Sequence, residues 1–270
     1  MKELFKSMKI LAIETTGPKA SVALINDRGA VSEETSEKML SHLQNLIPMI
    51  DDLLEKCGLA IDDDLLEKCG LAIDDVTHIA VSEGPGSFTG IRIGMATGKA
   101  LAQALGIPGI CVPTLRSFVR NDPEFKGLVC PLFDARRDQV YAGAYYWEEG
   151  SCCQAVKDDA YDPKEFLAAV EGFDPDHKMD VRFFGDGITV SLDSIKKWAV
   201  STKRLSMNDD VNRILADPDN RLQKASSVAM EALDIANAGG AKEFSKMQPV
   251  YLRKAEAERK LECRKQENIK

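Results

Sequence analysis

Apolar and polar residues along the first half of the chain fall into short runs that predict strands and longer periodic runs that predict helices. Residues 8–14 (MKILAIE) form a short apolar run typical of a buried strand. Turns at Gly17-Pro18 and at Asp27-Arg28-Gly29 separate it from two further strands, which predicts an opening meander. The expected elements are strands at 8–14, 20–25 and around 31, a helix at 36–57, a strand at 78–83, a helix at 91–105 and a strand at 109–112.

Proline and glycine modify the two expected helices. Pro48 interrupts the apolar pattern of the first helix and predicts a kink there. Gly106 follows the second helix, where a left-handed glycine commonly ends a helix.

The second half repeats this plan more loosely. It predicts strands at 128–134 and 139–147, a helix at 163–170, a strand at 181–184 and a helix at 222–237. Two successive units of strand meander followed by alternating helix and strand indicate an α/β chain built from a duplicated unit.

A twelve-residue segment occurs twice without change. Residues 51–62 (DDLLEKCGLAID) are repeated as residues 63–74. A short period copied once is not a solenoid repeat. Gly58 and Gly70 disfavour one continuous helix, because glycine costs about 1 kcal/mol inside a helix and suits its end. We expect one copy to end the long helix and the other to add a short helical turn outside the core.

Composition and charge narrow the class of protein. A hydrophobic content of 44% among 270 residues is enough for a real core, which argues against disorder. The net charge of −8 should repel nucleic acid and acidic membranes, so direct RNA binding is not expected. There is no run of about 18 apolar residues and no secretory signal at the start, so we expect a cytoplasmic protein without a membrane span.

The glycine-rich segment Gly84-Pro85-Gly86-Ser87-Phe88-Thr89-Gly90 joins an expected strand to an expected helix. Glycines allow close approach, and a helix N-terminus favours anions, so the segment could bind a ligand. A tight structural turn explains it equally well. It lacks the Gly-Lys-Ser/Thr ending of a P-loop and does not match the Gly-x-Gly-x-x-Gly fingerprint.

Small residues recur on one face of the helix that follows this segment. Gly94, Gly98 and Ala102 are four residues apart, which permits close contact with another element. Inside the core this would be ordinary packing, whereas on the surface it would be a partner-binding face.

Polar residues after three other strands are candidates for phosphate loops. Glu14, Thr15 and Thr16 could hold a metal-bound phosphate, although capping the turn at Gly17-Pro18 is the commoner role of such residues. Asp134 occupies the corresponding place in the second half, where two arginines replace the glycines of a phosphate loop. Gly185 and Gly187 form a third, weaker candidate. The three histidines are scattered, so we expect no metal site.

Four ordered segments resemble the TsaB (YeaZ) family. They are 8–16 (MKILAIETT), 84–94 (GPGSFTGIRIG), 133–141 (FDARRDQVY) and 249–253 (PVYLR), and the similarity spans roughly residues 8 to 253. The resemblance implies two ribonuclease-H-like halves of the actin/Hsp70/sugar-kinase superfold, with mixed sheets flanked by helices. It divides the chain into halves at 8–112 and 113–253 and a charged tail at 254–270.

The resemblance also implies a function. Members of the family take part in forming threonylcarbamoyladenosine beside the tRNA anticodon, as non-catalytic partners of the catalytic paralogue TsaD and alongside the ATPase TsaE. The resemblance implies a protein that forms a homodimer when alone and contacts tRNA only indirectly. It implies no cofactor, and a nucleotide could bind only at the interface between this chain and TsaD. The alternatives are a kinase-like or a glycoprotease-like enzyme of the same superfold.

These implications assign two groups of residues. Partner-interface candidates are Gly84, Pro85, Gly86, Ser87, Phe88, Thr89, Gly90, Arg92, Gly94, Gly98 and Ala102. Glu14, Thr15, Thr16, Asp134, Gly185 and Gly187 become vestigial nucleotide loops. The sequence departs from the family pattern in residues 1–7, which precede the usual start at Met8, and in the twelve-residue repeat.

Overall fold

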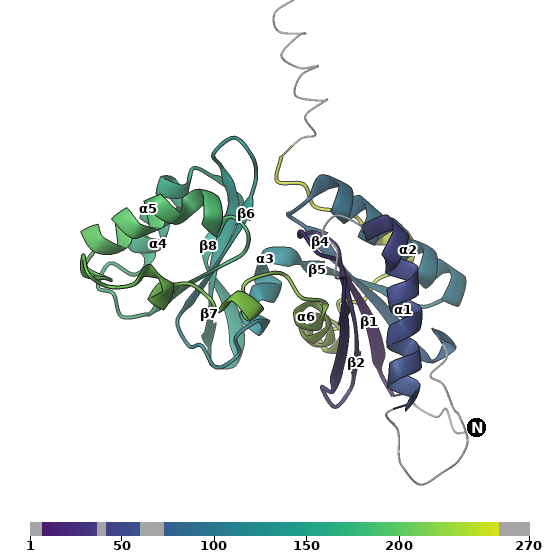
Figure 1. Cartoon of the computed structure of the whole chain (residues 1–270). Coiled ribbons are helices and arrows are strands. Elements are labelled where there is room, and N and C mark those ends of the chain that lie inside the picture. The colour runs from purple at the N-terminus through teal and green to yellow at the C-terminus, as the bar shows by residue number, and fades with distance from the viewer. Residues whose placement is uncertain (1–6, 37–41, 60–72, 254–270) are drawn as a thin grey trace, which may run out of the picture.

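The computed structural model describes residues 7–36, 42–59 and 73–253, and these form two lobes that each contain one sheet (Figure 1). The first sheet has the strand order β3-β2-β1-β4-β5, in which β2 runs antiparallel to β1 and β3, and β1, β4 and β5 are parallel. Its strands are β1 Lys9–Glu14, β2 Ser21–Asn26, β3 Val31–Thr35, β4 His78–Gly84 and β5 Gly109–Pro113.

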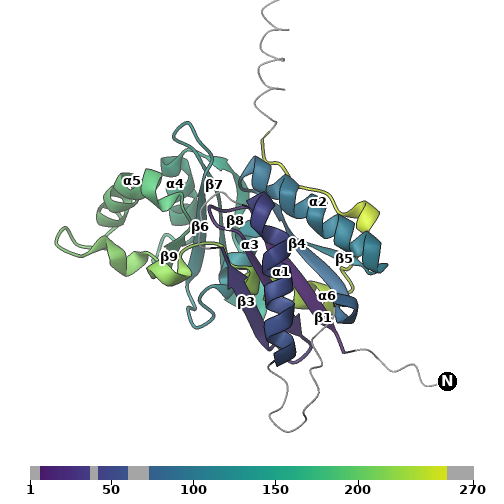
Figure 2. The same ribbon diagram turned by 45° about the vertical axis from the view of Figure 1, so that its right-hand side comes forward.

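Helices cover both faces of the first sheet. The helices α1 His42–Leu59 and α2 Phe88–Leu105 lie on one face, and α6 Ala225–Asn237 lies on the other, as Figure 2 shows. Strand β1 explains why both faces need cover: Leu11 and Ile13 join the core under α1 and α2, whereas Ile10 and Ala12 join the core under α6. A strand buried on both faces has the continuous apolar run seen in the sequence.

The second sheet repeats the first with one strand fewer. Its order is β8-β7-β6-β9, with β7 antiparallel to β6 and β8, and β9 parallel to β6. Its elements are β6 Leu128–Asp134, β7 Val140–Glu148, β8 Ser151–Tyr161, α4 Pro163–Phe173, β9 Val181–Phe184 and α5 Ile188–Ser201. Leu215 forms a parallel bridge with Phe183 at the edge where the first sheet has β5. The expected fold of two ribonuclease-H-like halves with mixed sheets is confirmed.

Two elements of this half are absent from the sequence prediction. Strand β8 is an edge strand whose residues are half-exposed or exposed except for Val156, and it includes the charged residues Lys157, Asp158 and Asp159, so its apolar alternation is weak. Helix α5 does carry a helical pattern, because Ile188, Ile195 and Ala199 are buried on one face.

The expected division at 8–112 and 113–253 needs a correction. Helix α6 packs on β1, β2 and β5, although its sequence position follows the second sheet. Met247 is likewise buried in the first lobe, beside Gly109. The physical reason is that the apolar face of α6 covers the face of the first sheet that α1 and α2 leave open. The expected tail at 254–270 lies outside the described residues.

The chain therefore crosses between the lobes twice, and one side chain joins the two crossings. The first crossing contains α3 Thr114–Ser117 and the short 3₁₀ helix Phe118–Arg120. Immediately after it, Asn121 donates through Nδ2 to the carbonyls of Asn220 and Leu222 in the returning segment, both at 2.8 Å. Its Oδ1 accepts from Ser227 Oγ at 2.6 Å, so the crossing is tied to α6 as well.

The first copy of the twelve-residue repeat supplies the end of α1, as expected, because the helix runs to Leu59. Residues 60–72, which contain most of the second copy, lie outside the described residues. Pro48 lies inside α1. No helix in the described part of the chain is long and apolar enough to cross a membrane.

Candidate functional site

A cleft of about 500 Å³ lies between the two lobes, and three of the four family-like segments line it. The first lobe contributes the turn after β1 and the glycine segment before α2. The second lobe contributes the end of β6, the turn to β7 and the turn after β9. The lining residues are Thr16, Gly17, Pro18, Gly86, Ser87, Phe88, Thr89, Phe133, Asp134, Ala135, Arg136, Tyr141, Asp186 and Gln223.

Glu14 lies beneath the first-lobe wall and is fully buried. Its carboxylate accepts hydrogen bonds from the backbone N–H and the hydroxyl of Thr16 and from the hydroxyl of Ser82. Burial raises the pKa of the Glu14 carboxyl, and the hydrogen bonds from Ser82 and Thr16 offset this only in part. Glu14 therefore caps the turn at Gly17-Pro18, while Thr16 alone of the Glu14–Thr16 set reaches the cleft.

Replacing Glu14 by a side chain that does not titrate should change how the stability of the folded protein depends on pH. The folded protein holds this proton more tightly than the unfolded chain does, because the folded pKa is raised. The stability that protonated Glu14 contributes is therefore fully present below the pKa of this carboxyl in the unfolded chain. It is lost as pH rises through the pKa of the same carboxyl in the folded protein. We expect Glu14→Gln to match the wild type at acidic pH and to exceed its stability at alkaline pH. Urea unfolding across pH checks this, and parallel pH profiles would contradict it.

The glycine segment is a rigid joint between β4 and α2. Ser87 donates its backbone N–H to the carbonyl of Thr16 at 2.8 Å and caps α2 by accepting from the N–H of Gly90. Gly90 is needed for close approach, since a Cβ there would lie 1.9 Å from the carbonyl oxygen of Thr15. Gly84 and Pro85 are buried at the start of the segment, whereas Phe88 and Thr89 are exposed.

The small-residue face of α2 is packed inside the first lobe, which corrects the expectation of a surface face. Gly94, Gly98 and Ala102 are buried. A Cβ on Gly94 would lie 2.4 Å from Thr15 Oγ1, and one on Gly98 would lie 2.3 Å from Val81 Cγ2. These residues let α2 lie close to β1 and β4. Of the two roles that the sequence allows for this face, core packing and partner binding, the structure shows core packing.

The second-lobe wall carries two carboxylates and an unusual turn. Asp186 Oδ1 accepts from the backbone N–H of Asp134 at 3.3 Å. Burial raises the pKa of the Asp186 carboxyl, and the neighbouring Asp134 charge adds to this rise. Arg136, Arg137 and Asp138 have φ angles of 63°, 57° and 56°. Left-handed conformations cost about 1 kcal/mol or more per non-glycine residue, so this turn stores strain at the mouth of the cleft.

Gly185 and Gly187 serve packing in this wall. Gly185 has a φ of 92°, and a Cβ on it would lie 2.0 Å from the carbonyl oxygen of Leu132. Gly187 donates its N–H to the same carbonyl at 2.9 Å. The turn after β9 therefore lies directly on β6, and Asp186 between the two glycines is the residue that faces the cleft. The sequence pattern indicates the two glycines but gives no signal for the aspartate.

The segment Val250–Arg253 contacts both lobes beside the cleft (Figure 1). Val250 donates its N–H to the carbonyl of Glu83 at 2.7 Å in the first lobe. Arg253 Nη1 donates to the carbonyl of Ala135 at 3.1 Å in the second lobe. Between them, Tyr251 packs on Phe88 with ring centroids 5.1 Å apart and accepts a hydrogen bond from Arg92 Nε at 3.2 Å. The fourth family-like segment thus lies at the same site as the other three.

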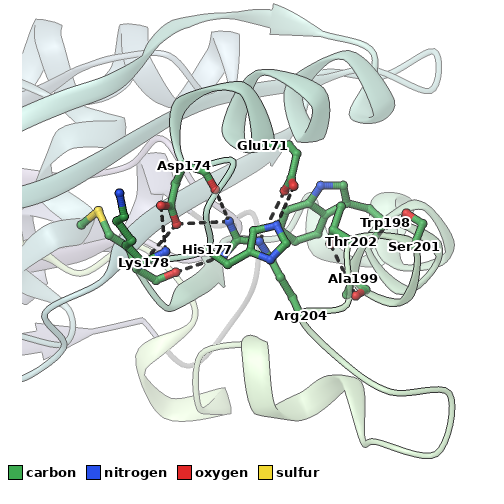
Figure 3. Close-up of polar contacts among 10 residues, drawn as sticks. Glu171, Asp174, His177, Lys178, Trp198, Ala199, Ser201, Thr202 and Arg204 are labelled. Atoms are coloured by element: carbon green, nitrogen blue, oxygen red, sulfur yellow. Dashed lines mark hydrogen bonds and ion pairs between the residues drawn. The ribbon is translucent and has the colours of Figure 1, made fainter.

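A second polar cluster lies in the second lobe, at the C-terminal ends of α4 and α5 and in the segments that follow them (Figure 3). Arg204 is only 6% exposed and donates to the carbonyls of Asp174 and Met179, each at 3.0 Å. It also pairs with the Asp174 carboxylate at 3.2 Å and with Glu171 at 3.5 Å. The Arg204 guanidinium and the Asp174 carboxylate each have several partners within this cluster, which is typical of a structural network. Among residues 7–36, 42–59 and 73–253, no three acidic, histidine or cysteine side chains are grouped to hold a metal ion.

Comparison with known proteins identifies the family. A family model described as TsaD, tRNA N6-adenosine threonylcarbamoyltransferase, matches residues 26–261. The chain belongs to this family, in its TsaB (YeaZ) branch.

Individual relatives carry the TsaB and YeaZ names. The tRNA threonylcarbamoyladenosine biosynthesis protein TsaB of Escherichia coli is 27% identical over 94% of this chain and 98% of its own length. TsaB of Bacillus subtilis is 36% identical over 56% of this chain and 61% of its own length. The solved structure of YeaZ from Pseudomonas aeruginosa superposes with a TM-score of 0.64 at 26% identity, covering 90% of this chain and 99% of that one.

Proposed function

We propose that this TsaB-family chain is a non-catalytic subunit in tRNA threonylcarbamoyladenosine formation that binds and activates a TsaD-like threonylcarbamoyltransferase. The proposed assembly also includes a TsaE-like ATPase, and the chain pairs with itself when TsaD is absent. Contact with tRNA is made through the partner, in keeping with the net charge of −8.

The observation that carries this proposal is an exposed aromatic and arginine cluster at the start of α2. Phe88 and Tyr251 are each 38% exposed although both are large and apolar. Arg92 lies over the Phe88 ring with 3.8 Å between its guanidinium carbon and the ring centroid. Aromatic and arginine side chains are enriched at the centres of protein interfaces, where their burial supplies most of the binding energy.

The cleft supports a non-catalytic role for the chain. The turn after β6 carries Arg136, Arg137 and Asp138 where a loop that wraps a phosphate would use glycine. Asp134, the residue at the end of β6, is engaged by Arg136, whose Nη1 lies 3.4 Å from its carboxylate. Neither feature favours the kinase-like alternative.

Reconstitution tests the activity. The purified protein should neither hydrolyse ATP nor modify tRNA alone, and it should raise the rate of tRNA modification when added to TsaD and TsaE. Failure to enhance that rate, or modification by the protein alone, would refute the proposal.

Truncating the cluster should weaken the complex. We expect Phe88→Ala to lower affinity for the TsaD-like partner at least tenfold, because it removes an exposed ring that a partner would bury. Phe173→Ala is the matched control, since Phe173 is 41% exposed on the second lobe and contacts Tyr146 as Phe88 contacts Tyr251. Calorimetric titration measures both, and equal losses for the two variants would argue against this interface.

A further inference from the structure

Residues 250–253 form a strap that contacts both lobes. In Figure 2 the yellow end of the described chain follows α2 and stops beside the boundary with the second lobe. The strap lies outside the helices and strands of the structure. Contacts with other segments, rather than a hydrogen-bonding pattern of its own, therefore fix its position.

The strap is attached to the first lobe through both main chain and side chain. Val250 donates its N–H to the carbonyl of Glu83 at 2.7 Å. A Cβ on Gly84 would lie 2.4 Å from the carbonyl oxygen of Val250, so the two backbones are in direct contact. Tyr251 adds the ring contact with Phe88, with 5.1 Å between the centroids. These combined contacts make the first-lobe attachment the stronger one.

The side chain of Arg253 attaches the strap to the second lobe. Its Nη1 donates to the carbonyl of Ala135 at 3.1 Å, and its guanidinium carbon lies 5.9 Å from the centroid of the Tyr141 ring. A hydrogen bond from a charged donor shifts an equilibrium by about tenfold or more. A long, half-exposed side chain loses conformational freedom when it makes such a bond, so this attachment depends on how firmly the rest of the strap is held.

The carbonyl that Arg253 binds belongs to the base of the strained turn between β6 and β7. Ala135 donates its N–H to the carbonyl of Gln139 at 2.9 Å and so closes the turn. Residues 136–138, which lie between them, have φ angles of 63°, 57° and 56°. The left-handed conformation is disfavoured by roughly five- to thirtyfold at each non-glycine residue. Contacts from outside the turn are needed to hold it, and Arg253 supplies one of them.

The two attachments are linked because they belong to one short segment. Tyr251 and Phe88 are each 38% exposed, so a protein that covers them restrains the strap two residues before Arg253. A strap that is already restrained loses less freedom when Arg253 reaches Ala135. Covering the rings on the first lobe therefore favours the contact on the second lobe.

We propose that the strap couples the surface formed by Phe88 and Tyr251 to the turn at residues 136–138. A protein bound on the two rings holds the strap, and the strap holds the turn in its left-handed conformation. That this protein is a TsaD-like subunit rests on the proposed function, whereas the coupling is a property of this chain alone. Because coupling between two sites is reciprocal, a held turn favours binding of that protein by the same factor.

Hydrogen exchange of the free protein, followed by mass spectrometry, tests the coupling. We expect Arg253→Met to speed exchange at residues 134–141 by roughly tenfold, because the turn loses a charge-assisted hydrogen bond. Phe88→Ala should speed exchange at the same residues by a smaller factor, because it loosens the strap. The double variant should exchange no faster than Arg253→Met. Wild-type exchange at the turn in Phe88→Ala, or additive effects in the double variant, would overturn the proposal.

Further variants separate coupling from a general loss of structure. Phe173→Ala removes an exposed ring elsewhere on the second lobe and should leave exchange at the turn unchanged. Residues 114–121, at the first crossing, should exchange as in the wild type in every variant. If Arg253→Met speeds them too, the comparison passes to Arg253→Lys, which keeps the charge and a donor. Arg253→Lys should fall between the wild type and Arg253→Met, and wild-type exchange at its turn would overturn the proposal.

Adding a TsaD-like protein distinguishes this inference from the proposed function. Binding at the proposed surface should slow exchange at residues 84–92 in both the wild type and Arg253→Met. Coupling should slow exchange at the turn in the wild type alone. Slowing at the turn in both proteins would show that the partner covers the turn directly and would overturn the coupling. Unchanged exchange at residues 84–92 would instead refute the proposed interface, and the free-protein comparison would still decide the coupling.

Discussion

Replacing Gly90 by alanine is expected to destabilise the protein by about 3 kcal/mol. The added Cβ would lie 1.9 Å from the carbonyl oxygen of Thr15, which is a backbone atom that cannot turn away. Thr15 also donates its hydroxyl to the carbonyl of Gly90 at 2.7 Å, so the two segments are held together at this point. The expected sign opposes helix propensity, because alanine ordinarily stabilises a helix interior by about 1 kcal/mol relative to glycine.

The matched control is Gly172→Ala in α4. Gly172 is also a helical glycine, but a Cβ there would meet no atom within 4 Å. We expect this variant to be about as stable as the wild type or up to about 1 kcal/mol more stable. Urea unfolding of both variants gives the comparison. Similar free energies of unfolding for the two variants would show that α2 can move away from β1 at little cost.

Replacing Arg204 by methionine should destabilise the second lobe by about 3–5 kcal/mol. The substitution leaves Asp174 buried without its guanidinium partner and removes the donors from two carbonyls. Arg213→Met is the control: its guanidinium is exposed and pairs with Asp209 at the surface, so we expect a loss of no more than about 0.5 kcal/mol. Chemical denaturation followed by Trp198 fluorescence measures both. Equal effects would contradict a structural role for the buried pair.

The same pair predicts a pH dependence. Burial alone would raise the pKa of Asp174, but the backbone N–H groups of Met179 and Lys178 and the Arg204 guanidinium together lower it. Because the pKa of Asp174 is lower in the folded protein, its ionised carboxylate stabilises the fold at pH values above its unfolded pKa of about 3.9. This stabilisation is lost as pH falls through the pKa of Asp174 in the folded protein. The difference in stability between the wild type and Arg204→Met should therefore shrink at strongly acidic pH.

The repeating arrangement of strands and helices follows from local sequence. Apolar runs such as 8–14 and 78–83 form strands buried on both faces, because only the centre of a covered sheet accommodates an unbroken run. Ser87 and Gly106 mark the two ends of α2 by capping chemistry that acts within one turn. The family-like segments are local too, and this is why the resemblance could be recognised from the sequence.

Long-range packing decided the rest. The sequence could not show whether Gly94, Gly98 and Ala102 faced a partner or the core, because their spacing is the same in both cases and only contact with Val81 distinguishes them. It could not assign α6 to the first lobe, since helical periodicity reveals an apolar face but not the sheet that the face covers. Gln223 carries no local signal at all. It lines the cleft because Gly17, Asn121 and the turn after β9 hold the segment around it, and only the tertiary structure brings these distant segments together.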